Sequence, residues 1–115
     1  MLFRSYTDVI DSFLSHRKKV SGNYTSNGET LLLFGNVIAY HEEGQTYITP
    51  SGWSTMTTAK ALNYLIREAG GVVKRIVLGN NPRIFVTDKL YELPIESSDR
   101  INLATGQKIY KSQGE

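Results

Sequence analysis

The stretch that decides the fold reads FGNVIAYHEEGQTYITPSGWSTMTTAKALNYLIREAGG, over residues 34–71. Its first part is rich in β-branched and aromatic residues over 37–42 and again over 45–49, which is typical of two β-strands. Glu43-Gly44 separates the two runs and suits a tight turn, so together they predict a hairpin. Pro50 has no amide proton to donate, and it ends the strand pairing.

A helix is predicted after this hairpin, over residues 57–69. The residues expected on its buried face are Thr58, Leu62, Leu65, Ile66 and Ala69. Those expected on the opposite face are Lys60, Asn63, Tyr64 and Arg67. Gly70-Gly71 closes the helix, because glycine adopts a left-handed conformation without steric cost.

Outside this stretch, apolar residues at helical spacing predict a first helix over 6–17, and His16 to Lys19 would place positive charge at its end. Residues 21–28 show no period and are expected to form a loop. Further strands are predicted over 30–34, 72–78 and 83–87.

These elements predict a single α+β domain over residues 1–93, in which an antiparallel or mixed sheet of about five strands packs against one or two helices. Residues 94–115 turn polar and are expected to form a partly ordered tail. Within this tail, residues 108–110 would add a short edge strand. An exposed sheet edge of this kind favours pairing between two copies, so a homodimer is one expectation.

Composition excludes several classes of function. The 115 residues contain no cysteine, which rules out disulfides, thiolate chemistry and zinc–thiolate sites and suits a reducing compartment. The formal net charge of +2 is too small to demand a nucleic-acid or membrane partner. No apolar run has the length of a signal peptide or a membrane span, so a cytoplasmic protein is expected.

Several short motifs follow one another between about residues 31 and 87. They are Val37-Ile38-Ala39-Tyr40, Tyr47-Ile48-Thr49, Gly52-Trp53-Ser54-Thr55, Thr57-Thr58, Leu62-Asn63 and an aromatic residue, Phe85, on a later hairpin. A hairpin followed by this Ser/Thr-rich helix start resembles small uncharacterised proteins of bacteriophages and other mobile elements. The resemblance implies a compact α+β domain and a viral setting, hence the host cytoplasm. It implies no known activity or catalytic residue.

The first candidate site is the start of the second helix, where hydroxyl groups gather at Ser54, Thr55, Thr57 and Thr58. Unpaired amides and the positive end of the helix dipole make a helix start attractive to anions, and Lys60 would complete a phosphate cradle. The alternative is plain helix capping, which some of these residues must perform in any case.

The second candidate site is a stripe along the exposed helix face, formed by Lys60, Tyr64 and Arg67. Cations bind phosphates, and a tyrosine stacks on a base or fills a pocket of a partner protein. The full predicted contact set adds Lys74, Arg75 and Arg83. An ordinary solvated face with a half-buried tyrosine is the alternative.

Catalysis has less support. His41 stands at a hairpin tip beside two glutamates, and a metal site would require His16 to approach it in space. No catalytic residue, metal site or cofactor is predicted. The leading hypothesis is a small phage or mobile-element accessory protein that binds a host or viral protein. Nucleic-acid binding is the alternative, and a metal-dependent hydrolase is the second alternative.

Overall fold

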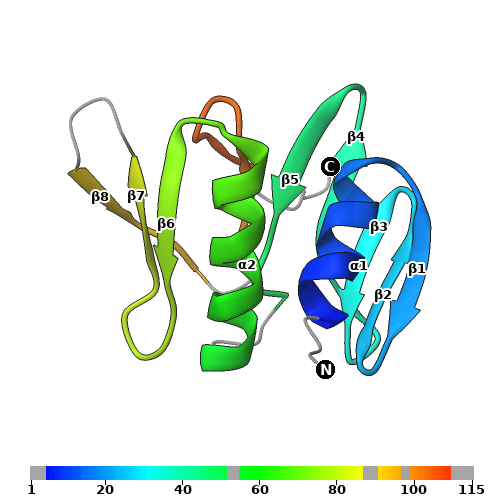
Figure 1. Ribbon diagram of the computed structural model, residues 1–115. Helices are drawn as coiled ribbons and strands as arrows, with labels where there is room; N and C mark the ends of the chain where they lie inside the picture. The colour runs from blue at the N-terminus through cyan, green and yellow to red at the C-terminus, as the bar shows by residue number, and fades with distance from the viewer. Residues whose placement is uncertain (1–4, 52–54, 87–90, 97–98, 110–115) are drawn as a thin grey trace, which may run out of the picture.

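The computed structural model describes residues 5–51, 55–86, 91–96 and 99–109, which form two α-helices and ten β-strands (Figure 1). The first six elements are α1 (Ser5–Leu14), β1 (Lys18–Ser21), β2 (Tyr24–Asn27), β3 (Thr30–Leu33), β4 (Asn36–Glu42) and β5 (Gln45–Ile48). They are followed by α2 (Met56–Ala69), β6 (Val73–Val77), β7 (Arg83–Val86), β8 (Tyr91–Pro94), β9 (Arg100–Asn102) and β10 (Lys108–Ile109). The predicted α+β class is confirmed, with more strands than expected.

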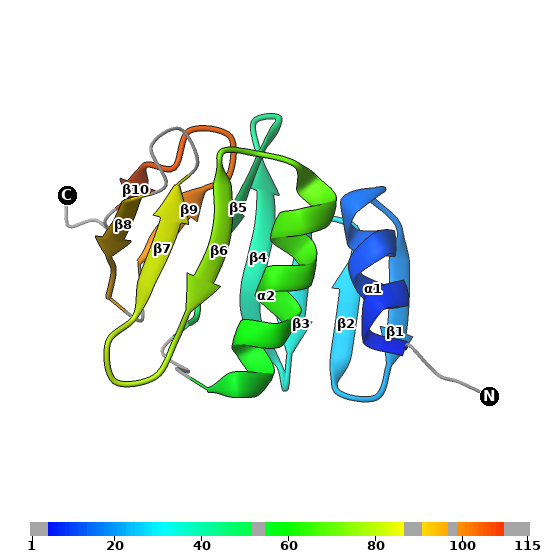
Figure 2. The ribbon, with the colours of Figure 1, turned by 60° about the vertical axis from the view of Figure 1, so that its left-hand side comes forward.

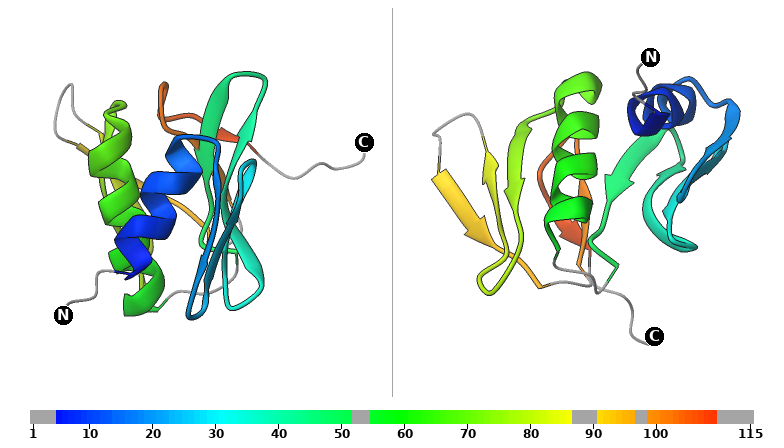
Figure 3. Two further views of the ribbon diagram at one scale, coloured as in Figure 1. Left: turned by 45° about the vertical axis from the view of Figure 1, so that its right-hand side comes forward. Right: turned by 60° about the horizontal axis from the view of Figure 1, so that its bottom comes forward.

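The strands form two antiparallel sheets in different layers (Figure 2). The large sheet has seven strands in the order β1-β2-β3-β4-β5-β9-β10, and the small sheet has three in the order β6-β7-β8. Both helices lie on the same face of the large sheet, and the small sheet continues the helical layer beyond α2 (Figure 3). As a result, α2 is flanked by α1 on one side and by β6 on the other.

One hydrophobic core fills the space between the two layers. The largest fully buried side chains are Phe13, Ile10, Leu31, Ile38, Ile48, Leu62, Leu65, Ile66, Ile76, Ile84, Ile101 and Val9. Each stabilises the fold by about 1.5–3 kcal/mol relative to an exposed position. The buried face predicted for α2 is confirmed except at Ala69, which is exposed at the end of the helix, whereas Ala61 is buried.

The prediction of a loop over residues 21–28 is wrong, because most of this segment belongs to the β1–β2 hairpin. The segment is polar and lacks an apolar alternation, so its strands depend on contacts with the rest of the chain. Ser26 is buried in β2, and its hydroxyl donates to the carbonyl oxygen of Arg17 at 2.7 Å. The first helix is also shorter than predicted, and Lys18 and Lys19 lie on β1 instead of at the helix end.

The segment after Pro94 contributes more to the fold than the sequence suggests. Ile95, Ile101 and Leu103 are at most 5% exposed and belong to the core. β9 joins the large sheet by pairing with β5, and β10 forms the sheet edge, which confirms the edge strand predicted near residue 108. The expected partly ordered tail does not describe residues 99–109, and residues 110–115 lie outside the described ranges.

A side-chain amide joins α2 to the small sheet. The Oδ1 atom of Asn63 accepts from the backbone N–H of Ile76 at 2.8 Å, and its Nδ2 atom donates to the carbonyl oxygen of Ile76 at 2.9 Å. Ile76 lies on β6, and on the opposite side of this strand it stands across from Ile84 of β7. These two hydrogen bonds hold β6 beside the helix and fix the width of the space between them.

Candidate functional site

A groove of about 470 Å³ lies between the C-terminal half of α2 and β6. Its lining residues are Asn63, Ile66, Arg67, Gly70, Lys74 and Arg75, and we refer to it as the basic groove. Three of these residues are cationic, and none of those that line it in the described part of the chain is acidic. The groove therefore concentrates positive charge from two elements that are joined by a short connection.

A β-bulge in β6 explains why two cations in succession line the groove. The register with β7 shifts between Val73 and Arg75, so one extra residue is accommodated there. Val73 and Ile76 are buried, while Lys74 and Arg75 between them are both exposed. A regular strand would turn one of these two neighbours toward the core. The bulge thus keeps both positive charges on the outside of the sheet.

Both arginines of the groove rest on aromatic rings. The Cζ atom of Arg67 lies 5.6 Å from the ring centroid of Tyr64, and that of Arg75 lies 5.8 Å from the centroid of Phe85. Contacts of this type stabilise the cation and restrict its side chain. Arg67 also lies 3.8 Å from Glu68, but its side chain is 74% exposed, and such a pair contributes little. The two guanidinium groups are thus partly ordered before any ligand binds.

Only part of the predicted stripe along α2, formed by Lys60, Tyr64 and Arg67, is exposed in a way that would suit binding. Tyr64 is half-buried, and its hydroxyl donates to a carboxylate oxygen of Asp11 at 2.9 Å. Its ring also packs edge-on against Tyr6, with centroids 6.0 Å apart. Tyr64 therefore links α2 to α1, and the structure supports the half-buried tyrosine that the sequence left as the alternative.

The other two predicted contact residues lie away from the basic groove. The Nζ atom of Lys60 is 5.4 Å from the ring centroid of Tyr6, about two helical turns before Arg67. Arg83 forms an ion pair with Glu92 at 2.6 Å and lines another recess with Asn81 and Pro94, although its Cζ atom also lies 5.8 Å from the ring centroid of Phe85, the ring that Arg75 contacts. Of the predicted set, the structure brings together Arg67, Lys74 and Arg75. Asn63 and Gly70 also line the groove, although sequence patterns indicate no role in binding for either.

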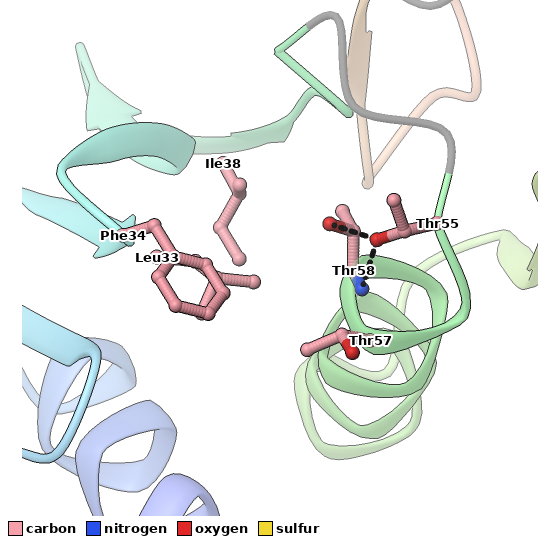
Figure 4. A pocket seen from close by; sticks show the side chains of 6 residues that line it. All are labelled: Leu33, Phe34, Ile38, Thr55, Thr57 and Thr58. Atoms are coloured by element: carbon pink, nitrogen blue, oxygen red, sulfur yellow. Dashed lines mark hydrogen bonds between the residues drawn. The ribbon is translucent and has the colours of Figure 1, made fainter.

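The hydroxyl groups at the start of α2 are engaged in capping. The Oγ1 atom of Thr55 accepts from the amide of Thr58 at 3.3 Å and donates to the hydroxyl of Thr58 at 3.1 Å (Figure 4). Thr58 is only 2% exposed. The capping interpretation is therefore confirmed at Thr55, whereas Ser54 lies outside the described residues. Thr57 lines a small recess whose other walls include Leu33, Phe34 and Ile38, a mainly apolar setting that does not suit an anion.

His41 has a structural role between β4 and the end of α1. A carbonyl oxygen only accepts, so Nε2 of His41 carries the proton and donates to the carbonyl of Phe13 at 2.9 Å. Nδ1 of the same ring is hydrogen-bonded to the hydroxyl of Thr46 at 3.1 Å. His16 does approach, but the two imidazoles stack with centroids 4.1 Å apart, so their nitrogens do not converge on one point. No group of three potential ligands occurs in the described part of the chain, and the hydrolase hypothesis gains no support.

The substitution His41→Ala is expected to lower the free energy of unfolding by about 2 kcal/mol. It removes the donor to the last turn of α1 and the stacking on Phe13, whose centroid lies 4.2 Å away. Urea titration followed by circular dichroism measures the change. His16→Ala is the comparison variant: it removes the stacking on the other side of the His41 ring, its side chain is 59% exposed, and its loss should cost about 0.5–1 kcal/mol. Equal effects of the two substitutions would contradict the structural role of His41.

Comparison with known proteins gives one match. No curated protein and no solved structure matches this chain. Residues 8–106 match the family described as Kyanoviridae Gp96 protein, a range that includes all of α2, α1 from Asp8 onward, and every strand except β10. None of the described helices has the length and apolar character needed to cross a membrane. The predicted phage origin is thereby confirmed, and the chain belongs to the Gp96 protein family of the Kyanoviridae, a group of cyanophages.

Proposed function

We propose that this phage protein acts by binding nucleic acid, with the basic groove as its contact with the sugar-phosphate backbone. The observation that carries the proposal is the gathering of Arg67, Lys74 and Arg75 around one groove without an acidic lining residue. Arginine presents a planar fork of donors to phosphate oxygens, and lysine adds a compact charge. Phosphate contacts of this kind supply most of the sequence-independent affinity for nucleic acids.

Two further features support binding over a merely solvated surface. The bulge in β6 places Lys74 and Arg75 together at the surface although the residues on either side of them, Val73 and Ile76, are buried. The aromatic rings beneath Arg67 and Arg75 reduce the conformational freedom that these side chains lose on binding. Both features lower the cost of placing positive charge on a phosphate.

Charge reversal tests the proposal. The double variant Lys74→Glu, Arg75→Glu is expected to weaken binding to a mixed-sequence oligonucleotide by about 100-fold or more at low salt. Fluorescence anisotropy of a labelled oligonucleotide measures the dissociation constant. The matched control is Lys18→Glu, Lys19→Glu, which makes the same change in net charge on exposed residues of β1 at the far end of the large sheet (Figure 2). Equal weakening by both double variants would show that overall charge, not the groove, determines binding.

Binding to a host or viral protein is a second candidate, favoured by an apolar surface at the other end of α2. Phe34 is 57% exposed and lines a recess of about 150 Å³ with Leu33, Ile38 and the threonines at the helix start (Figure 4). Exposed aromatic residues beside apolar recesses are typical of protein interfaces. Affinity purification from infected host cells at two salt concentrations separates the candidates, because apolar association survives added salt and phosphate contacts do not.

A further inference from the structure

We infer that the basic groove takes a single strand of nucleic acid and not a duplex. This inference rests on the proposed function and names the form of the ligand. It draws on three properties of the groove: its size, the aromatic residues next to its arginines, and the number of its positive charges.

The size of the groove favours a single strand. About 470 Å³ between a helix and a strand leaves room for the backbone of only one or two nucleotides. In a duplex, base pairing and stacking hold each strand against its complement, so neither strand leaves the helix to enter such a space. A single strand bends freely and places its phosphates inside the groove. The duplex would touch only the rim.

The rings beside the groove give a second reason. Arg67 lies on Tyr64 at one wall, and beyond the other wall both Arg75 and Arg83 lie over the ring of Phe85, each with its Cζ atom 5.8 Å from the centroid. Phe85 pairs with Arg75 across β6 and β7, and it lies between the buried residues Ile84 and Val86, so its ring is on the outer face of the small sheet. Unpaired bases stack on aromatic rings and on guanidinium planes, whereas the bases of a duplex are already stacked on one another. The rings and guanidinium groups beside the groove therefore favour a single strand over a duplex.

The number of groove cations predicts the salt dependence. Three positive side chains line the groove, and each neutralised phosphate of a single strand contributes about 0.7 to the logarithmic salt slope. The logarithm of the association constant is thus expected to fall with the logarithm of salt concentration with a slope of about −2.

The test compares one labelled DNA oligonucleotide with the duplex of the same sequence, by anisotropy with the full-length protein over a range of salt. We expect the single strand to bind at least about 10-fold more tightly, with the slope given above. Phe85→Leu keeps an apolar side chain but removes the ring, and it should weaken single-strand binding about 5-fold or more. Phe34→Leu is the matched control and should leave both affinities unchanged, and thermal unfolding verifies that both variants are folded.

The outcomes separate this inference from the proposed function. Equal or tighter binding of the duplex, abolished by Lys74→Glu, Arg75→Glu, would overturn the inference and leave nucleic-acid binding at the groove intact. Unchanged single-strand affinity in the folded Phe85→Leu variant would also count against the inference, because it would show that no base stacks on the ring of Phe85. Absence of salt-sensitive binding to either form would overturn both proposals.

Discussion

Replacement of Gly71 by alanine is expected to destabilise the protein by about 3 kcal/mol or more. A Cβ atom at this position would overlap the carbonyl oxygen of Leu103 and lie 2.7 Å from its carbonyl carbon. These are backbone atoms, so no side-chain rotation relieves the overlap. The same carbonyl oxygen accepts from the amide of Val72 at 3.0 Å, so the connection between α2 and β6 would have to move away from the segment after β9.

Gly70 provides the matched control for this prediction. It is the C-cap of α2 with φ 74°, and a Cβ atom there would meet no atom within 4 Å. Gly70→Ala should therefore cost only about 1 kcal/mol, the strain of a left-handed alanine. Urea unfolding of the two variants measures both values. If Gly71→Ala costs no more than Gly70→Ala, the close approach between Gly71 and Leu103 is incorrect.

Asn63→Ala is expected to lower the free energy of unfolding by about 2–3 kcal/mol. The substitution removes both partners of the backbone of Ile76, a residue that is 1% exposed. An N–H and a C=O group left unpaired in a buried strand each carry a desolvation penalty of about 1 kcal/mol or more. Under the proposed function, the variant should also bind nucleic acid more weakly, because the distance between α2 and β6 is no longer fixed.

Hydrogen exchange gives a local measurement of the same effect. The amide of Ile76 should exchange faster in Asn63→Ala than in the unchanged protein, beyond what the global loss of stability explains. Asn36→Ala is the control, since the side chain of Asn36 donates an exposed hydrogen bond of 3.4 Å to the carbonyl oxygen of Phe34, and its removal should cost less than about 0.5 kcal/mol. Unchanged exchange at Ile76 would contradict the proposed pairing.

Sequence patterns predict the centre of the fold well. The hairpin predicted over 37–42 and 45–49 corresponds to β4 and β5, and the helix predicted over 57–69 corresponds to α2. These segments have strong periods and clear end signals, because local conformation and burial favour the same structure there. The strands predicted around β6 and β7 agree for the same reason.

The remaining elements depend on distant partners. β2 has the sequence YTSN, which lacks an alternation of apolar and polar residues, and it forms because it pairs with both β1 and β3. β9 is only three residues long and is stabilised by pairing with β5, more than fifty positions earlier in the chain. Such contacts leave no local pattern, so periodicity alone assigns these segments to loops or to a tail.

In the candidate site, too, some features follow from local sequence and others depend on distant partners. Arg67 and Lys74 are separated by a helix stop and a short connection, so their proximity follows from the sequence once α2 and β6 are recognised. The bulge that exposes both Lys74 and Arg75 arises from the register with β7, which the sequence of β6 alone does not specify. Helical spacing places Tyr64 on the correct face of α2, but its engagement by Asp11 depends on how α1 packs.

The amide of Asn63 also limits where a second chain could pair with the small sheet. Its donor and acceptor lie in one plane and mimic a peptide unit, so α2 substitutes for a missing neighbour strand at Ile76. An extended chain that approached the small sheet from that side could not pair with Ile76, because the backbone N–H and C=O groups of this residue are already hydrogen-bonded to Asn63. Lateral growth of the small sheet is therefore confined to its β8 border.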